Sequence, residues 1–178
     1  IFELMNFNFI KLNKVDSTNN YALKLLKNKN FSPTIIVSNI QTQGRGRYGN
    51  KWISLKGNIF MSVLFEINKR LKINEITKKN CKIIKSALGN IIKKKIDIKP
   101  PNDLLIDKKK VCGILQEIIT CEKRRFLIVG IGINLIKSPK IDSYPTSHLS
   151  NYTKKKIKKN DIYNIIKKKY LKSLRSFN

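Results

Sequence analysis

The segment Gln41–Trp52, QTQGRGRYGNKW, holds the densest group of unusual residues in the chain. It contains three of the eight glycines and the only tryptophan. It also contains two of the six arginines, in a chain whose usual cation is lysine, present 32 times. Glycine backbones and guanidinium groups that alternate in this way can approach a phosphate or a carboxylate closely. Taken alone, the segment is also compatible with a flexible basic surface loop.

Hydrophobic patterns on the N-terminal side of this segment, and directly after it, predict strands and one helix. They are a strand at Phe7–Leu12, an N-cap at Asp16-Ser17-Thr18 for a helix that carries Ala22, Leu25 and Leu26 on one face, and strands at Thr34–Ile40 and Asn58–Ile67.

Further along the chain, the patterns predict two more helices and four more strands. They are a helix with the stripe Ile76, Ile83, Ile84, Ala87, Leu88 and Ile91; short strands at Ile96–Lys99 and Leu104–Ile106; a turn at Asp107-Lys108-Lys109; long strands at Lys110–Ile119 and Arg125–Leu135; and a last helix with Ile162, Ile165, Ile166, Tyr170 and Leu174. Runs of strands with few helices predict an α+β fold, in which a mixed β-sheet is covered on one face by helices.

The segment VGIGINL, from Val129 to Leu135, is typical of a core strand whose glycines allow a ligand or another backbone to come close. It lacks the third glycine and the helix start of a dinucleotide-binding fingerprint.

The segment KPPNDLLIDKKKVCGILQE adds polar groups. Asn102 and Asp103 follow two prolines and are therefore held rigidly, so Asp103 could hold Mg²⁺ or orient a phosphate. Lys110 opens a strand after a tight turn, where one cation can be aimed inward. An ordinary turn and a solvated lysine run are the plainer interpretations.

The formal net charge of +27 suggests nucleic acid or an acidic surface as a partner. The lysines are scattered over every segment, however, so we expect a solvated surface with only non-specific polyanion binding at low salt and no specific DNA site.

Three cysteines without metal-ligand spacing favour a reducing compartment. Without a signal peptide or an apolar run of about 20 residues, we expect a cytoplasmic protein that does not contact a membrane.

Five elements in this order, DSTN, QTQGRGRYGNKW, PPNDL, KKVCGIL and GIGINL, resemble those of the biotin–protein ligases over roughly Phe7 to Leu149. The resemblance implies the catalytic-domain fold shared by class II aminoacyl-tRNA synthetases and biotin synthetases. It also implies a reaction in which ATP and biotin, with Mg²⁺, give biotinyl-5'-adenylate. The biotinyl group then passes to one lysine of the biotin carboxyl carrier protein of acetyl-CoA carboxylase.

The resemblance also implies roles for individual residues. Ser17, Thr18, Asn19 and Gln41 would meet the biotin head group; Arg45, Gly46 and Arg47 would form the loop over the adenylate; Trp52, Gly113, Gly130 and Gly132 would line the ligand site; and Asn102, Asp103 and Asn134 would serve the nucleotide, its phosphates or Mg²⁺, with Asp103 as the metal ligand. Lys110, Arg47 and Asp103 would be the catalytic residues, and Lys110 would contact the biotin carbonyl and the developing charge.

This sequence departs from the family pattern at Pro100, where a tryptophan is usual, and at Asn50, where a basic residue is common. We expect residues 1–178 to form a single catalytic domain without an N-terminal DNA-binding domain, and with the small C-terminal barrel of many relatives absent or truncated. Two alternatives are weighed. A lipoate or octanoate ligase or transferase of related fold normally carries an Arg-Arg-x-Ser-Gly-Gly-Gly type loop. A non-catalytic basic nucleic-acid-binding protein would gather its basic residues with exposed aromatics. His148, the only histidine, is expected in a surface loop.

Overall fold

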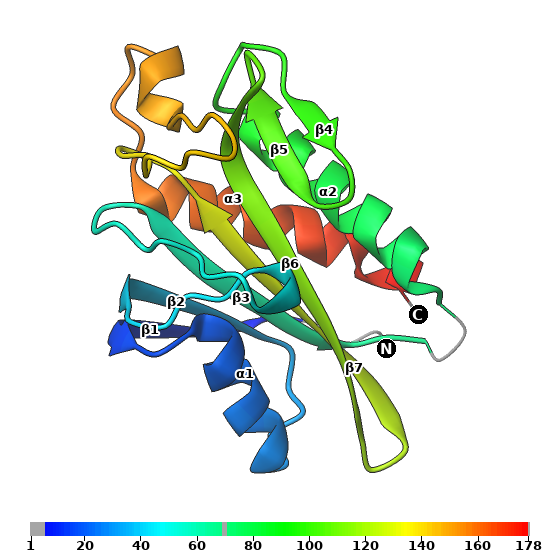
Figure 1. Cartoon of the computed structure of the whole chain (residues 1–178). Helices are drawn as coiled ribbons and strands as arrows, with labels where there is room; N and C mark the ends of the chain where they lie inside the picture. The colour runs from blue at the N-terminus through cyan, green and yellow to red at the C-terminus, as the bar shows by residue number, and fades with distance from the viewer. Residues whose placement is uncertain (1–5, 69–70, 178) are drawn as a thin grey trace.

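A computed structural model describes residues 6–68 and 71–177. One mixed sheet of seven strands runs through these residues in the order β1-β2-β3-β7-β6-β5-β4 (Figure 1). The strands are β1 (Asn8–Val15), β2 (Thr34–Gln41), β3 (Ile59–Glu66), β4 (Asp97–Lys99), β5 (Asp103–Ile106), β6 (Lys109–Cys121) and β7 (Arg124–Ile133). β1 and β2 pair in parallel, and the other neighbouring strands pair antiparallel.

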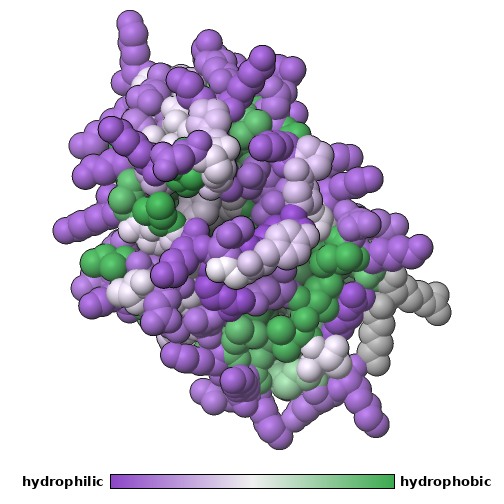
Figure 2. All heavy atoms as spheres, viewed as in Figure 1, coloured by the Kyte–Doolittle hydropathy of each residue, from purple (hydrophilic) through white to green (hydrophobic). Residues whose placement is uncertain are grey.

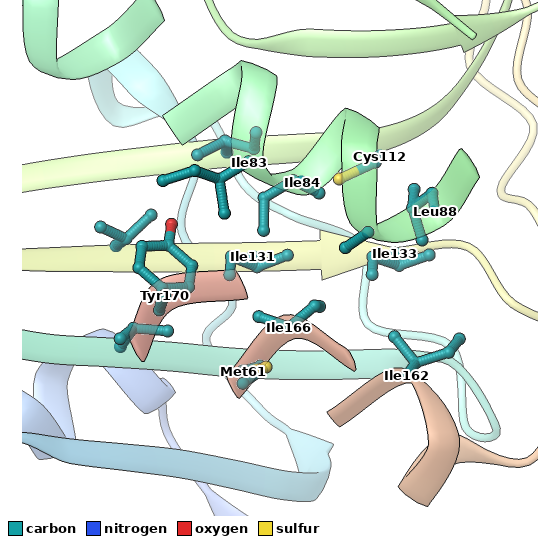
Figure 3. Close-up of a cluster of buried hydrophobic side chains, with 14 of the residues drawn as sticks. Met61, Ile83, Ile84, Leu88, Cys112, Ile131, Ile133, Ile162, Ile166 and Tyr170 are labelled. Carbon is teal, nitrogen blue, oxygen red and sulfur yellow. The ribbon is translucent and has the colours of Figure 1, made fainter. Parts of the chain in front are cut away.

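Two long helices, α2 (Ile73–Gly89) and α3 (Lys159–Ser173), cover one face of the sheet. The isoleucines of these helices pack on the central strands, as Figure 3 shows for Ile84, Ile166 and Ile131. Burying one such side chain contributes roughly 1.5–3 kcal/mol relative to leaving it exposed. The large core therefore lies between this face and the two helices.

The third helix, α1 (Thr18–Lys27), packs on the opposite face, where Ala22 and Leu26 meet a smaller cluster that includes Phe126 and Ile128 of β7. The expectation that helices cover only one face was therefore wrong, although the α+β fold with a mixed sheet is confirmed. Side chains two residues apart in a strand point to the same face. Gly130 and Gly132 thus continue the row of Phe126 and Ile128 without side chains, and leave room on the sheet beside α1.

Most predicted elements exist with small shifts at their ends. β6 begins at Lys109, so the expected turn is one residue shorter than predicted. β7 stops at Ile133. Beyond it, Oδ1 of Asn58 accepts hydrogen bonds from the backbone N–H groups of residues 135–137, which are therefore not paired with a strand. Ser17 occupies the N-cap position of α1 as predicted, but its side chain makes no capping hydrogen bond.

Hydrophilic side chains cover most of the face seen in Figure 2, in keeping with a dispersed positive charge. Among the described residues, no helix has the length and apolarity needed to cross a membrane.

Candidate active site

A cavity of about 740 Å³ lies on the α1 face of the sheet, over the glycines of β6 and β7. Almost all residues singled out from the sequence line it: Ser17, Thr18, Asn19, Gln41, Arg45, Gly46, Arg47, Trp52, Asn102, Asp103, Lys110, Gly113, Gly130 and Gly132. Asn134 lies in a small adjoining recess that shares Trp52 and Lys110 with the cavity. Segments that are far apart in the sequence thus meet in one place.

One end of the cavity carries neutral hydrogen-bonding groups from the start of α1. The backbone N–H and the hydroxyl of Thr18 lie 2.8 and 3.1 Å from Oε1 of Gln41. Ser62 of β3 donates to Oδ1 of Asn19 at 2.5 Å. Ser17, Thr18 and Asn19 are all buried. This end is suited to a neutral polar group, because buried amides and hydroxyls need partners but bring no net charge.

The other end carries charge. The ammonium nitrogen of Lys110 lies 2.9 Å from Oδ1 of Asp103, and both side chains are mostly buried. The same nitrogen lies 5.5 and 5.0 Å from the ring centroids of Trp52 and Tyr144, close enough for cation–π attraction. The strand residue Lys110 also pairs with the loop before Ser147, since its N–H donates to Pro145 and its carbonyl accepts from Ser147. Lys110 is therefore held at both its backbone and its side chain.

The glycine-arginine segment forms a small hairpin. The N–H of Gly46 donates to Asn50 at 2.7 Å and that of Trp52 donates to Gly44 at 2.9 Å. Tyr48 stands at the tip with φ of 54°, and 88% of it is exposed. The hairpin thus presents the two arginines beside the cavity on a defined backbone.

The two arginines have different surroundings. Arg45 pairs with the carboxylate of Glu117 on β6 and donates to Asn20 on α1 at 2.6 Å. Arg47 lies over the ring of Tyr48, 4.6 Å from its centroid, and contacts Asn102 at 3.5 Å. Within the described chain, no ion pair to a carboxylate is formed by Arg47. Of the two arginines, Arg47 is therefore the one that remains available to an anion.

The floor of the cavity depends on glycine. A Cβ atom at Gly132 would overlap the indole ring of Trp52, and one at Gly113 would lie 2.8 Å from the same ring. A Cβ atom at Gly130 would lie 2.5 Å from Oδ1 of Asn19. The close approach predicted for Gly130 and Gly132 is present, but side chains of the protein make it in this structure. The indole N–H of Trp52 is buried and has no acceptor within the described residues.

Asn134 is oriented by its neighbours. Its backbone N–H donates to Val111 at 2.9 Å, and its amide nitrogen donates to the carbonyl of Ser147 at 3.0 Å. Its Oδ1 is buried and receives no hydrogen bond from the described part of the chain. Leaving a buried acceptor unpaired costs about 1–3 kcal/mol, so this oxygen is suited to a ligand N–H group.

No group of three or more His, Cys, Asp or Glu side chains that could hold a metal gathers anywhere in residues 6–68 and 71–177. Mg²⁺ is commonly bound by only one or two carboxylates when phosphates supply further ligands. Asp103 lies in the cavity and uses one oxygen toward Lys110, so its other oxygen fits that role.

The residues that sequence reasoning missed include Tyr144, which lines the cavity, and Ser62 and Glu117, which contact cavity-lining side chains. Tyr144 lies in a loop without any motif, so no signal was present. Ser62 is one polar residue within a run of apolar strand residues, so the sequence pattern did not mark it as a site residue. Glu117 could have been found, because it follows Gly113 by four residues in a strand and therefore shares its face. His148 lies in a loop as expected, and partial burial lowers its pKa.

A model of the Biotin/lipoate A/B protein ligase family matches residues 12–134. The chain belongs to this family. The bifunctional ligase/repressor BirA of Bacillus subtilis is 35% identical over 77% of this chain and 43% of the relative. The biotin–[acetyl-CoA-carboxylase] ligase of Paracoccus denitrificans is 33% identical over 72% of the chain and 55% of the relative. The chain thus spans about half the length of these curated relatives.

Solved structures of the biotin/lipoate A/B protein ligase family share the fold. The biotin protein ligase from Aquifex aeolicus in complex with biotin and ATP superposes with a TM-score of 0.80 and 31% identity, over 96% of this chain and 71% of the other. The fold found here is thus the one that this ligase uses.

Proposed function

We propose that this chain is the catalytic part of a biotin–protein ligase. It activates biotin with ATP as biotinyl-5'-adenylate and transfers the biotinyl group to a lysine of a carrier protein. One observation carries the proposal: a single cavity joins a neutral hydrogen-bonding end to a cationic end. The names of the relatives from Paracoccus denitrificans and Aquifex aeolicus support the same activity.

The neutral end matches the ureido ring of biotin. That ring has N–H donors and a carbonyl acceptor but no charge. Thr18 and Gln41, which are hydrogen-bonded to each other, and Asn19, which accepts from Ser62, supply hydroxyl and amide partners. A lipoyl dithiolane ring or an octanoyl chain offers no N–H donor or carbonyl acceptor to exchange hydrogen bonds with these buried groups, which disfavours those substrates. The hydrogen-bonding end therefore supports biotin within a family that also includes lipoate ligases.

The cationic end matches the first reaction step. A carboxylate oxygen of biotin attacks the α-phosphorus of ATP, and pyrophosphate leaves with the electrons of the broken P–O bond. Two anions must approach each other, so fixed cations lower the barrier. We propose that Lys110, which pairs with Asp103, neutralises charge near the attacking carboxylate, and that Arg47, which contacts Asn102, binds the phosphates.

In the second step, the amine of the carrier lysine attacks the acyl carbon and AMP leaves. The mixed anhydride must survive until then, and water would hydrolyse it. A hairpin that lies over the cavity protects it. Trp52 and Arg47 belong to that hairpin, so we propose that they retain the adenylate. Asn134, with its unpaired Oδ1, is proposed to accept a hydrogen bond from the adenine amino group.

Mg²⁺ would be held by Asp103 together with ATP phosphates, and would supply charge neutralisation during pyrophosphate departure. The biotin carboxyl carrier protein of acetyl-CoA carboxylase is the proposed acceptor, in line with the name of the Paracoccus relative. We also propose that residues 1–178 act as one catalytic domain in the cytoplasm. Three free cysteines support the reducing compartment.

The test measures pyrophosphate release and label transfer with purified protein, ATP, Mg²⁺ and labelled biotin. We expect release that depends on biotin, and label on a carrier domain but not on a carrier whose target lysine is replaced by arginine. Release with lipoate or octanoate and none with biotin would show that the proposed substrate is wrong.

A further inference from the structure

Glu117 of β6 connects two elements that border the cavity. Its Oε1 pairs with Arg45 of the hairpin, and its Oε2 accepts a hydrogen bond from Nδ2 of Asn19 on α1 at 2.8 Å. The side chain of Glu117 is 19% exposed and that of Arg45 is 37% exposed. One carboxylate on the rigid sheet therefore contacts both the hairpin and the neutral end of the cavity.

The bond from Asn19 fixes the orientation of the Asn19 amide. Since Nδ2 donates to Glu117, Oδ1 must face the opposite way, toward Ser62. Asn19 is 3% exposed, so little space remains for the amide to rotate. Glu117 thus determines which atoms of Asn19 can meet a ligand.

The pairing with Arg45 fixes one strand of the hairpin. The opposite strand of the hairpin, which ends at Trp52, has its own contacts. Gln41 donates to the Ser54 hydroxyl at 3.2 Å, and that hydroxyl lies 3.4 Å from the carbonyl of Trp52. The hairpin is thus tied to the rest of the cavity at both of its strands, and Glu117 supplies the only ion pair among these ties.

We propose that Glu117 is a positioning residue that holds the hairpin over the cavity through Arg45. The two arginines then have separate tasks: Arg45 anchors the hairpin to the sheet, and Arg47 faces the ligand anion. This inference rests on the proposed function for its effect on the adenylate. The hairpin position itself can be measured without any ligand.

The single tryptophan makes that measurement direct, because all tryptophan fluorescence of the protein comes from Trp52 in the hairpin. Acrylamide is the suitable quencher, since a neutral molecule is not concentrated by the positive protein surface. Glu117→Gln is the principal variant. Its amide oxygen can still accept from Asn19, while Arg45 loses an anionic partner.

We expect Glu117→Gln and Arg45→Ala each to raise the quenching constant about twofold. The double variant should add little to the effect of Arg45→Ala, because that change already breaks the pair with Glu117 and also removes the hydrogen bond to Asn20. Glu66→Gln is the matched control. It removes the same charge from a pair between Glu66 and Arg124 in which both side chains are more than 40% exposed. If the acrylamide quenching constant of Glu117→Gln equals that of Glu66→Gln, the proposal is wrong.

A second readout separates anchoring from general stabilisation. With biotin and ATP, Glu117→Gln should release biotinyl-adenylate about tenfold faster than the wild type, while the temperature midpoint of unfolding stays close to that of Glu66→Gln. A lower midpoint with unchanged quenching and release would mean a structural role only. If the wild type forms no adenylate, the proposed function fails, while the quenching experiment still decides whether Glu117 anchors the hairpin.

Discussion

Lys110 faces Asp103 across a β-bulge between β5 and β6. Leu104 pairs with Cys112 and Leu105 pairs with Lys110, so Val111 is an extra residue in β6. Val111 and Cys112 both point into the large core, which strict alternation would not allow. The bulge therefore turns the side chain of Lys110 to the cavity face, where its ammonium meets Asp103 at 2.9 Å.

Replacing Lys110 should impair catalysis far more than replacing its neighbours. Removing a cation aimed at developing charge in a sheltered site costs roughly 2.7–4 kcal/mol, or about 10²–10³ in rate. Lys108 and Lys109 are exposed. We expect Lys110→Ala to lower biotin-dependent pyrophosphate release by that factor, with Lys108→Ala and Lys109→Ala near the wild type. Similar rates in all three variants would mean that the lysine run is only a charged turn.

Arg47→Gly should weaken retention of the adenylate more than its formation. Arg47 contributes a charge-assisted contact, which is worth about 1.5–3 kcal/mol when it is made to an anion. Biotinyl-adenylate should then leak and label lysines of bystander proteins. Lys56→Ala is the charge control, because Lys56 lies in the same β2–β3 connection but does not line the cavity. The measurement is the dissociation rate of the adenylate, and equal rates in Arg47→Gly and Lys56→Ala would contradict a lid role.

Strand and helix positions followed from local patterns, because β1 alternates polar with apolar residues, β2 and β3 are short apolar runs, and α2 carries an apolar stripe. The bulge at Val111 did not, since its sequence KKVC contains no glycine or proline to signal an irregularity. Lys110 was identified from the family motif instead. The placement of α1 on the second face also lay beyond local patterns, because Ala22 and Leu26 are compatible with either face.

The cavity-lining residues were foreseen where a motif contained them. Their partners were not foreseen. Strand alternation can place Glu117 on the cavity face, but its pairing with Arg45 depends on how β6 and the hairpin lie in space, which neither local segment shows. The family resemblance placed both arginines of the hairpin in the loop over the adenylate and made Arg47 catalytic, but it assigned no anchoring role to Arg45. Their different surroundings became visible only when β6 was placed beside the hairpin.

Gly132→Ala should disturb the cavity without a large loss of fold. The added methyl group would overlap the indole of Trp52, so the ring must move. We expect a shift in Trp52 fluorescence and weaker biotin binding. Gly89→Ala is the control, because a Cβ atom there meets nothing within 4 Å and alanine favours the end of α2. If biotin titrations give the same affinity for both variants, close packing on Gly132 is unimportant for the site.

The stability of the protein should fall as the pH rises above about 9, and Cys81 should account for part of that loss. Burial raises the pKa of the Cys81 thiol from 9.0 to about 11, with a smaller contribution from Asp103. Between these values the unfolded chain loses the thiol proton while the folded chain keeps it, so unfolding becomes more favourable with rising pH. Near pH 11, a pKa difference of this size lowers the free energy of unfolding by about 2 kcal/mol. Urea unfolding of Cys81→Ala and the wild type at pH 8 and at pH 10.5 measures the effect. The variant should lose less stability between the two pH values, whereas parallel losses would show that Cys81 does not ionise on unfolding as proposed.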